Sequence, residues 1–124
     1  MSFNFNQKID RPFLFAMYED DYQYMEEIFN TTRRQLEPDI EKVEQAFTDQ
    51  DSEGLRKSVH KIKPAFGFVG LLETEAACQK FEDSCISVSS ALELKPQYET
   101  LLAIIKESQK ILEEECVRLK EHNN

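Results

Sequence analysis

Hydrophobic side chains recur along most of the chain at intervals of three and four residues, which is the period of an amphipathic helix. The clearest stripe is formed by Leu55, Val59, Ile62, Phe66 and Val69. It predicts a helix that buries one face, with Ser52 as its cap and Gly70 as its stop. No segment alternates hydrophobic and polar residues for long enough to predict a strand.

Two helices are predicted before this one. Asp10 and the early Pro12 are typical of a helix start, so the apolar residues that follow predict a short N-terminal helix. A longer helix follows, with Asp20 or Asp21 as its cap. Pro38 lies inside its pattern, and proline lacks a backbone donor and restricts the residue before it, so we expect a break or kink there.

Two helices are also predicted after the stripe. Thr74 and Glu75 are expected to open one of them, and Lys95-Pro96 is expected to start the last one. The serines between these helices are typical of a loop. We expect residues 1–8 and 121–124 to be loosely ordered, because chain ends usually are.

These elements predict an all-α fold, an antiparallel four-helix bundle with a short extra N-terminal helix. The 124 residues are enough for one domain, which we expect to span residues 1–124. The aromatic residues near the N-terminus are interpreted as a cap on the bundle rather than as a ligand site: Phe3, Phe5, Phe13, Phe15, Tyr18 and Tyr22.

Charge and cysteine content limit the classes of partner and the cellular location that can be expected. Lys and Arg total 15 and Asp and Glu total 24, for a formal charge of −9, which disfavours binding to nucleic acids and anionic membranes. No apolar run is long enough to span a bilayer, and no secretion signal is visible at the N-terminus. The 3 cysteines lack metal-site or disulfide spacing, so a reducing cytoplasmic location is expected.

The face of the predicted third helix opposite its apolar stripe carries candidate chemistry. His60 points about 140° away from the centre of the stripe, and Lys63, Pro64 and Gly67 lie beside it. Neutral imidazole is a good nucleophile, and a lysine one turn away can neutralise a phosphoryl group on it. Pro64 and Gly67 both lower the stability of a helix, which indicates that these positions were selected for a property other than helix stability.

Structural alternatives exist for each of these residues. A single surface histidine is usually only a solvated side chain, and a His–Lys pair at this spacing is common. Gly67 is explained equally by a neighbouring helix that approaches closely. The joint placement of these residues on one exposed strip is what favours the functional interpretation.

The segment Ser58-Val59-His60-Lys61-Ile62-Lys63-Pro64-Ala65-Phe66-Gly67-Phe68-Val69-Gly70-Leu71 resembles the phosphoacceptor helix of histidine-containing phosphotransfer (HPt) domains. That family pattern has a lysine three residues after the histidine, small residues at the fourth and seventh positions, and Gly-Leu at the tenth and eleventh. The chain length and the order of the predicted helices are also similar to the family.

Two positions depart from the family pattern. Pro64 stands where the family most often has glycine, which reshapes the expected docking face. Glu82 stands where the family often has a glutamine that hydrogen-bonds to the imidazole. A carboxylate there can accept the Nδ1 proton and orient the ring, but its charge opposes the phosphorylated state; a solvated surface glutamate is the equal alternative.

The resemblance implies a phosphorelay intermediate. His60 would accept a phosphoryl group from a receiver-domain aspartate and pass it to another response regulator, while Lys63 screens the charge. Pro64, Gly67 and Phe68 would contact the partner, although Phe68 is as well explained by packing against the N-terminal helix. The implied partners are response-regulator receiver domains and a hybrid histidine kinase, with Mg²⁺ held by the receiver, and the implied state is a monomer.

The sequence contains no glycine-rich nucleotide-binding loop, so a phosphocarrier without its own ATP site or cofactor is expected, rather than an enzyme. The alternative is a non-catalytic helical adaptor that binds signalling partners without phosphotransfer. A metal enzyme is disfavoured, because His60 and His122 are the only histidines and no paired metal-ligand motif is present.

Overall fold

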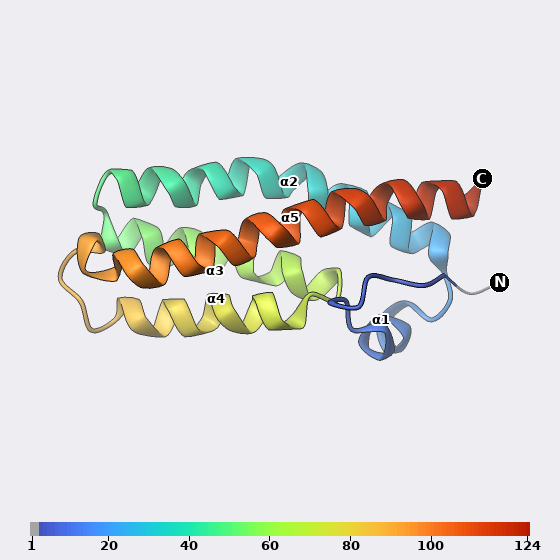
Figure 1. Cartoon of the computed structure of the whole chain (residues 1–124), viewed down its shortest axis with the longest axis horizontal. Helices are drawn as coiled ribbons and strands as arrows, with labels where there is room; N and C mark the ends of the chain where they lie inside the picture. Colours follow the sequence, from blue (N-terminus) through green and yellow to red (C-terminus); the bar gives the residue numbers. More distant parts are fainter. Residues whose placement is uncertain (1–2) are drawn as a thin grey trace.

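The computed structural model describes residues 3–124, in which five α-helices follow one another (Figure 1). Their bounds are α1 Arg11–Tyr18, α2 Tyr22–Thr48, α3 Ser52–Phe68, α4 Leu72–Cys85 and α5 Lys95–Asn123, with a 3-10 turn, η1, at Ala91–Leu94. The four long helices form an antiparallel bundle, and α1 lies at the same end of it as the end of α5. No strand occurs within residues 3–124, so the predicted all-α bundle with an extra N-terminal helix is confirmed.

Aspartate side chains cap the first three helices. Asp10 accepts a hydrogen bond from the Phe13 amide and Asp21 accepts one from the Tyr24 amide, as the sequence predicted. The prediction for α3 is wrong by one residue, because Asp51 is the cap and Ser52 is the first helical residue. A carboxylate accepts the orphan amides of a first turn and also complements the positive end of the helix dipole.

Of the break or kink predicted at Pro38, the break does not occur, because α2 is one continuous helix through this residue. Proline removes the hydrogen bond to the carbonyl of Arg34, but Arg34 and Pro38 are both exposed, so water can reach that carbonyl. The buried residues Leu36 and Ile40 continue the apolar stripe on either side. Burial of this stripe outweighs the local cost of the proline.

The prediction that Thr74 and Glu75 open the fourth helix is also wrong, because α4 already begins at Leu72. Thr74 is buried, and its hydroxyl lies 2.7 Å from that of Ser108 on α5. This polar pair satisfies two hydroxyls between the helices.

Helix α3 packs against both α2 and α4. All five residues of its predicted stripe are buried, at 0–1% exposure. Full burial of each such side chain contributes roughly 1.5–3 kcal/mol. This core fixes the rotation of α3, and therefore fixes which residues lie on its opposite face.

Loose order was expected at residues 1–8 and 121–124. Residues 1–2 lie outside the described part, and some of the other residues make tertiary contacts. Phe3 is buried, and its ring lies 5.5 Å from that of His122. The Asn123 amide donates to the Tyr22 carbonyl and to Glu26. Aromatic burial and these tertiary hydrogen bonds hold the last turn of α5, which would otherwise fray.

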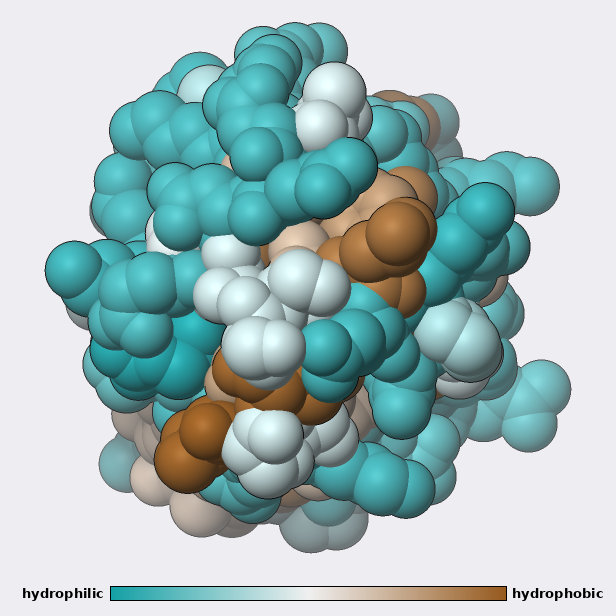
Figure 2. Space-filling view, turned by 90° about the vertical axis from the view of Figure 1, so that its left-hand side faces the viewer, coloured by the Kyte–Doolittle hydropathy of each residue, from teal (hydrophilic) through white to brown (hydrophobic). Residues whose placement is uncertain are grey.

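The aromatic cap is confirmed for five of its six residues, because Phe15 is 55% exposed. At the opposite end of the bundle, the α4–α5 connection exposes Ile86 and Leu92. Figure 2 looks onto that end and shows apolar surface gathered in patches among hydrophilic side chains. Within residues 3–124, no helix has the length and apolar character needed to cross a membrane.

Candidate functional site

The imidazole of His60 projects from the face of α3 opposite the core, and 65% of its side-chain surface is exposed. Its Nδ1 lies 2.7 Å from Oε1 of Glu82, which is on α4. The ring is therefore fixed through one nitrogen while most of its surface faces solvent. This geometry favours the orienting interpretation of Glu82 over the solvated one.

The turn between α3 and α4 explains why these two residues meet. Gly70 adopts a φ of 77°, which glycine tolerates and other residues rarely adopt, and its carbonyl accepts a hydrogen bond from the Asp10 amide. The Leu71 amide bonds back to the carbonyl of Phe66 and closes the end of α3. Because the chain reverses here, positions at similar distances from the turn lie side by side on the two helices.

This antiparallel register produces a ladder of contacts between α3 and α4. Each step of three or four residues forward along α3 is matched by an equal step back along α4. The three successive pairs are His60 with Glu82, Lys63 with Gln79, and Gly67 with Glu75.

Lys63 lies along α4 rather than in solvent, and only 18% of its side chain is exposed. Its Nζ is 2.8 Å from Oε2 of Glu82 and donates a hydrogen bond of 2.6 Å to Oε1 of Gln79. The sequence placed Lys63 beside His60 on one exposed strip of the helix. The structure corrects this, because a carboxylate and an amide one turn apart on α4 hold the ammonium down.

Glu82 is nearly buried, at 7% exposure, and holds both functional side chains of α3 through its two oxygens. Burial alone would raise the pKa of this carboxyl, but the contacts with Lys63 and His60 outweigh it and leave the pKa below its usual value. The group is therefore a carboxylate at neutral pH.

A carboxylate next to Nδ1 determines the state of the other ring nitrogen. An ionised carboxylate only accepts hydrogen bonds, so the Nδ1 that contacts it must be the donor. In neutral imidazole one nitrogen carries the proton and the other carries the lone pair. Nε2 of His60 is therefore the free nucleophilic position of the ring.

Gly67 is buried, and a methyl group on it would overlap the carboxylate of Glu75. The interpretation in which Gly67 contacts a partner is therefore corrected, because this residue is covered by α4. Its neighbour α4 fills that space, as the close-approach alternative required. Phe68, by contrast, is 51% exposed, and its backbone carbonyl accepts a hydrogen bond from the Tyr18 hydroxyl. Pro64 is exposed on the same helix.

Basic residues surround His60 on this otherwise acidic chain. Lys57 and Lys61 are exposed one turn before and one residue after it. Lys61 lies 3.4 Å from the buried carboxylate of Asp39 on α2. The face of α3 near His60 therefore carries two exposed lysines, one of which is paired with a carboxylate, on a chain whose net charge is −9.

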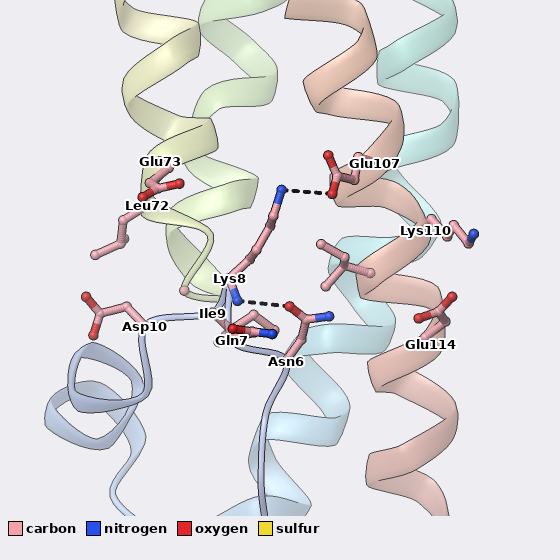
Figure 3. A pocket seen from close by; sticks show the side chains of 12 residues that line it. Asn6, Gln7, Lys8, Ile9, Asp10, Leu72, Glu73, Glu107, Lys110 and Glu114 are labelled. Carbon is pink, nitrogen blue, oxygen red and sulfur yellow. Dashed lines mark hydrogen bonds and ion pairs between the residues drawn. The ribbon is translucent and has the colours of Figure 1, made fainter.

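A cavity that the N-terminal segment helps to form lies away from this site. It has a volume of about 750 Å³ and lies between the N-terminal segment, the start of α4 and α5 (Figure 3). The ion pair of Lys8 with Glu107, at 2.8 Å, crosses it. Its lining includes neither His60 nor Glu82, so the exposed imidazole and not a pocket is the candidate site.

Comparison with known proteins agrees with this geometry. The family model described as "Hpt domain" matches residues 27–121, which include all of α3 and α4. The chain belongs to the Hpt domain family. Members of this family are phosphocarrier modules in two-component signalling, rather than classical enzymes, and they interact with receiver domains and histidine kinases.

A solved structure has the same fold as this Hpt domain. It is the HPT domain of a sensor hybrid histidine kinase from Shewanella, with 16% identity and a TM-score of 0.75, over 90% of this chain and 95% of that one. A search of curated proteins gave no match. The match to the family model begins after α1, so the N-terminal segment lies outside it.

Two residues of the site were missed from the sequence, Gln79 and Glu75. Both are polar residues of α4 that face α3 through the ladder of contacts. A signal for them was present, because stepping back from Glu82 by three and then four residues reaches each of them. That step requires the register that the turn at Gly70 sets between the two helices.

Proposed function

We propose that this Hpt domain is a phosphorelay intermediate that accepts a phosphoryl group on His60 from a receiver-domain aspartate and passes it to another response regulator. The observation that carries the proposal is the exposed imidazole whose Nδ1 is held 2.7 Å from the Glu82 carboxylate. That contact leaves Nε2 as the nucleophile on the open side of the ring.

In the accepting step, the Nε2 lone pair attacks the phosphorus of an aspartyl phosphate. The Nε2–P bond forms as the P–O bond to the aspartate breaks, and the electron pair of that bond leaves with the carboxylate oxygen. The ring keeps its Nδ1 proton and becomes cationic, and the reverse step onto a second aspartate restores neutral imidazole. Positioning and electrostatics supply most of the catalysis in such a transfer.

Lys63 is the candidate for screening the phosphoryl charge. Its ammonium lies one turn from His60 and is held by Glu82 and Gln79 while the ring is free. A phosphoryl group on Nε2 offers a more highly charged partner, toward which this flexible side chain can turn.

The partner surface we propose surrounds His60. Exposed Pro64 and Phe68 supply apolar contacts, and the basic residues Lys57 and Lys61 complement an acidic receiver pocket. The receiver supplies Mg²⁺, and this chain contributes neither an ATP site nor a cofactor. We propose that the chain works as a monomer in the cytoplasm, between a hybrid histidine kinase and a regulator.

The test is transfer from a phosphorylated receiver domain in the presence of Mg²⁺, followed as acid-labile, base-stable phosphate on this chain. The native chain is compared with His60→Gln, and His122→Gln is the matched control because His122 packs against Phe3 at the far end of α5. We expect label on the native chain and on the control, and none on His60→Gln.

Equal labelling of the native chain and His60→Gln would contradict the assignment of the phosphoacceptor. Binding of several receivers without any labelling would favour the alternative function, an adaptor that docks on signalling partners without phosphotransfer.

A further inference from the structure

We propose that the carboxylate of Glu82 keeps the phosphorylated imidazole of His60 protonated at Nδ1 through neutral and mildly alkaline pH, and so keeps its phosphoryl group transferable. This inference rests on the proposed function and assigns Glu82 a role in the release step. Glu82 is a positioning residue in this account, because it contacts the ring and not the phosphoryl group.

The leaving group in the release step is the imidazole ring of His60. When the P–Nε2 bond breaks, its electron pair stays on Nε2. A ring that has kept its Nδ1 proton departs as neutral imidazole, whereas a ring that has lost this proton must depart as an anion. The neutral species is by far the better leaving group, so only the protonated ring transfers its phosphoryl group readily to an acceptor carboxylate.

A carboxylate in contact with Nδ1 favours the protonated ring. A negative charge within about 4–6 Å of an ionisable group typically shifts its pKa by about 1–3 units toward the charged form. The 2.7 Å contact between Nδ1 and Glu82 Oε1 is a charge-assisted hydrogen bond once the ring is cationic. An amide at this position would accept the same hydrogen bond without the charge.

Glu82 itself remains ionised over the pH range that matters. Burial would raise its pKa, but Lys63 and His60 outweigh burial and lower it. In the unphosphorylated chain, Lys63 also neutralises part of the charge of Glu82 through Oε2. Oε1 of Glu82 therefore contacts the ring of His60, and Oε2 contacts the ammonium of Lys63.

Few other ionisable groups face this pair. From α3, Arg56 lies one turn before His60 and interacts electrostatically with Glu82. From α4, burial raises the pKa of the Cys78 thiol to about 12 and that of Cys85 to about 11, so both are neutral. From α2, Asp39 is paired with Lys61. Glu82 is thus the negative charge in contact with the ring.

The experiment needs no partner protein. The full chain, in a His122→Gln background, is phosphorylated with inorganic phosphoramidate, and the ³¹P NMR shift of the phosphohistidine is followed from mildly acidic to mildly alkaline pH. The midpoint of this titration reports the protonation of the phosphorylated ring. The rate of spontaneous phosphoryl loss is measured over the same pH series.

Three variants sharpen the measurement. Glu82→Gln removes the charge with little change of shape, and Glu82→Asp retains a carboxylate on a shorter side chain. Glu73→Gln is the matched control, because it removes the same charge from an exposed position on the same helix. Circular dichroism verifies that each variant is folded.

We expect the midpoint of Glu82→Gln to lie about one pH unit below that of the native chain. At a pH above both midpoints its phosphoryl loss should be about tenfold slower. Glu82→Asp should recover part of both effects, and Glu73→Gln should match the native chain. Equal midpoints in Glu82→Gln and the native chain would overturn the inference while leaving His60 as the phosphoacceptor. No phosphohistidine at His60 in any chain would contradict the proposed function, and this inference with it.

Discussion

Glu82 and Glu115 are both buried glutamates with basic partners, but Glu115 belongs to a structural network and Glu82 belongs to the candidate site. Glu115 on α5 is 2% exposed, pairs with Arg118 one turn later and accepts a hydrogen bond from the Asn6 amide. Glu82 is 7% exposed, but one of its partners is the imidazole of His60, whose side chain is 65% exposed.

The comparison shows that a buried carboxylate does not by itself indicate a functional site. The partners of Glu115 are a permanent cation and a backbone amide, and Arg118 also reaches the carbonyl of Asn4 and the ring of Phe3. That network fastens the N-terminal segment to α5. Glu82 differs because its partner is a titratable ring whose second nitrogen is open to solvent.

The largest stability effect is expected for Glu115→Gln, at about 2 kcal/mol of unfolding free energy. The neutral amide leaves the Arg118 cation and the Asn6 amide competing for a single, weaker acceptor. Urea denaturation measures the loss. Phosphorylation of His60 should remain unchanged, and a variant that unfolds like the native chain would show that this network does not fasten the N-terminal segment.

Glu82→Gln should cost less stability, about 1 kcal/mol near neutral pH. Because the pKa of Glu82 is lowered in the folded chain, its charged form stabilises the fold above the ordinary carboxyl pKa of about 4.3. This contribution is lost as the pH falls through the lowered folded value. Unfolding free energies of the native chain and the variant, compared along a pH series, should therefore converge at acid pH. A difference that grows on acidification would contradict the sign of the shift.

The smallest effect is expected for Gly67→Ala, within about 1 kcal/mol of the native stability. Alanine gains helix propensity, but its methyl group must displace the Glu75 carboxylate, which is the end of a flexible side chain. Thermal unfolding measures the balance, and the double variant Gly67→Ala/Glu75→Ala is its control. A loss of several kcal/mol relieved in the double variant would show that Glu75 cannot move aside.

Much of the fold could be predicted from the spacing of hydrophobic residues along the sequence. The stripe from Leu55 to Val69 fixed the face of α3 and the exposure of His60, because apolar burial dominates the energetics. Asp10 and Asp21 were recognisable caps for the same local reason. Features that depend on tertiary contacts could not be predicted from the sequence. They include the continuity of α2 through Pro38 and the contacts of Phe3 and Asn123.

The candidate site was predictable only in part. The spacing of His60 and Lys63 is visible within one helix, and the position of Glu82 came from a family resemblance. The burial of Glu82, the contact of Lys63 with Gln79 and the placement of Glu75 over Gly67 all depend on the α3–α4 register. A glutamate on an isolated helix gives no sign of whether a neighbouring helix covers it.

The most direct test of the account is nitrogen NMR of His60 in the ¹⁵N-labelled chain, before and after phosphorylation. Long-range couplings to the ring protons distinguish the two nitrogens and reveal which one carries a proton. The account predicts Nδ1 protonated and Nε2 unprotonated in the free chain at a pH where the imidazole is neutral, and the phosphoryl group on Nε2 afterwards. A proton on Nε2, or a phosphoryl group on Nδ1, would contradict it.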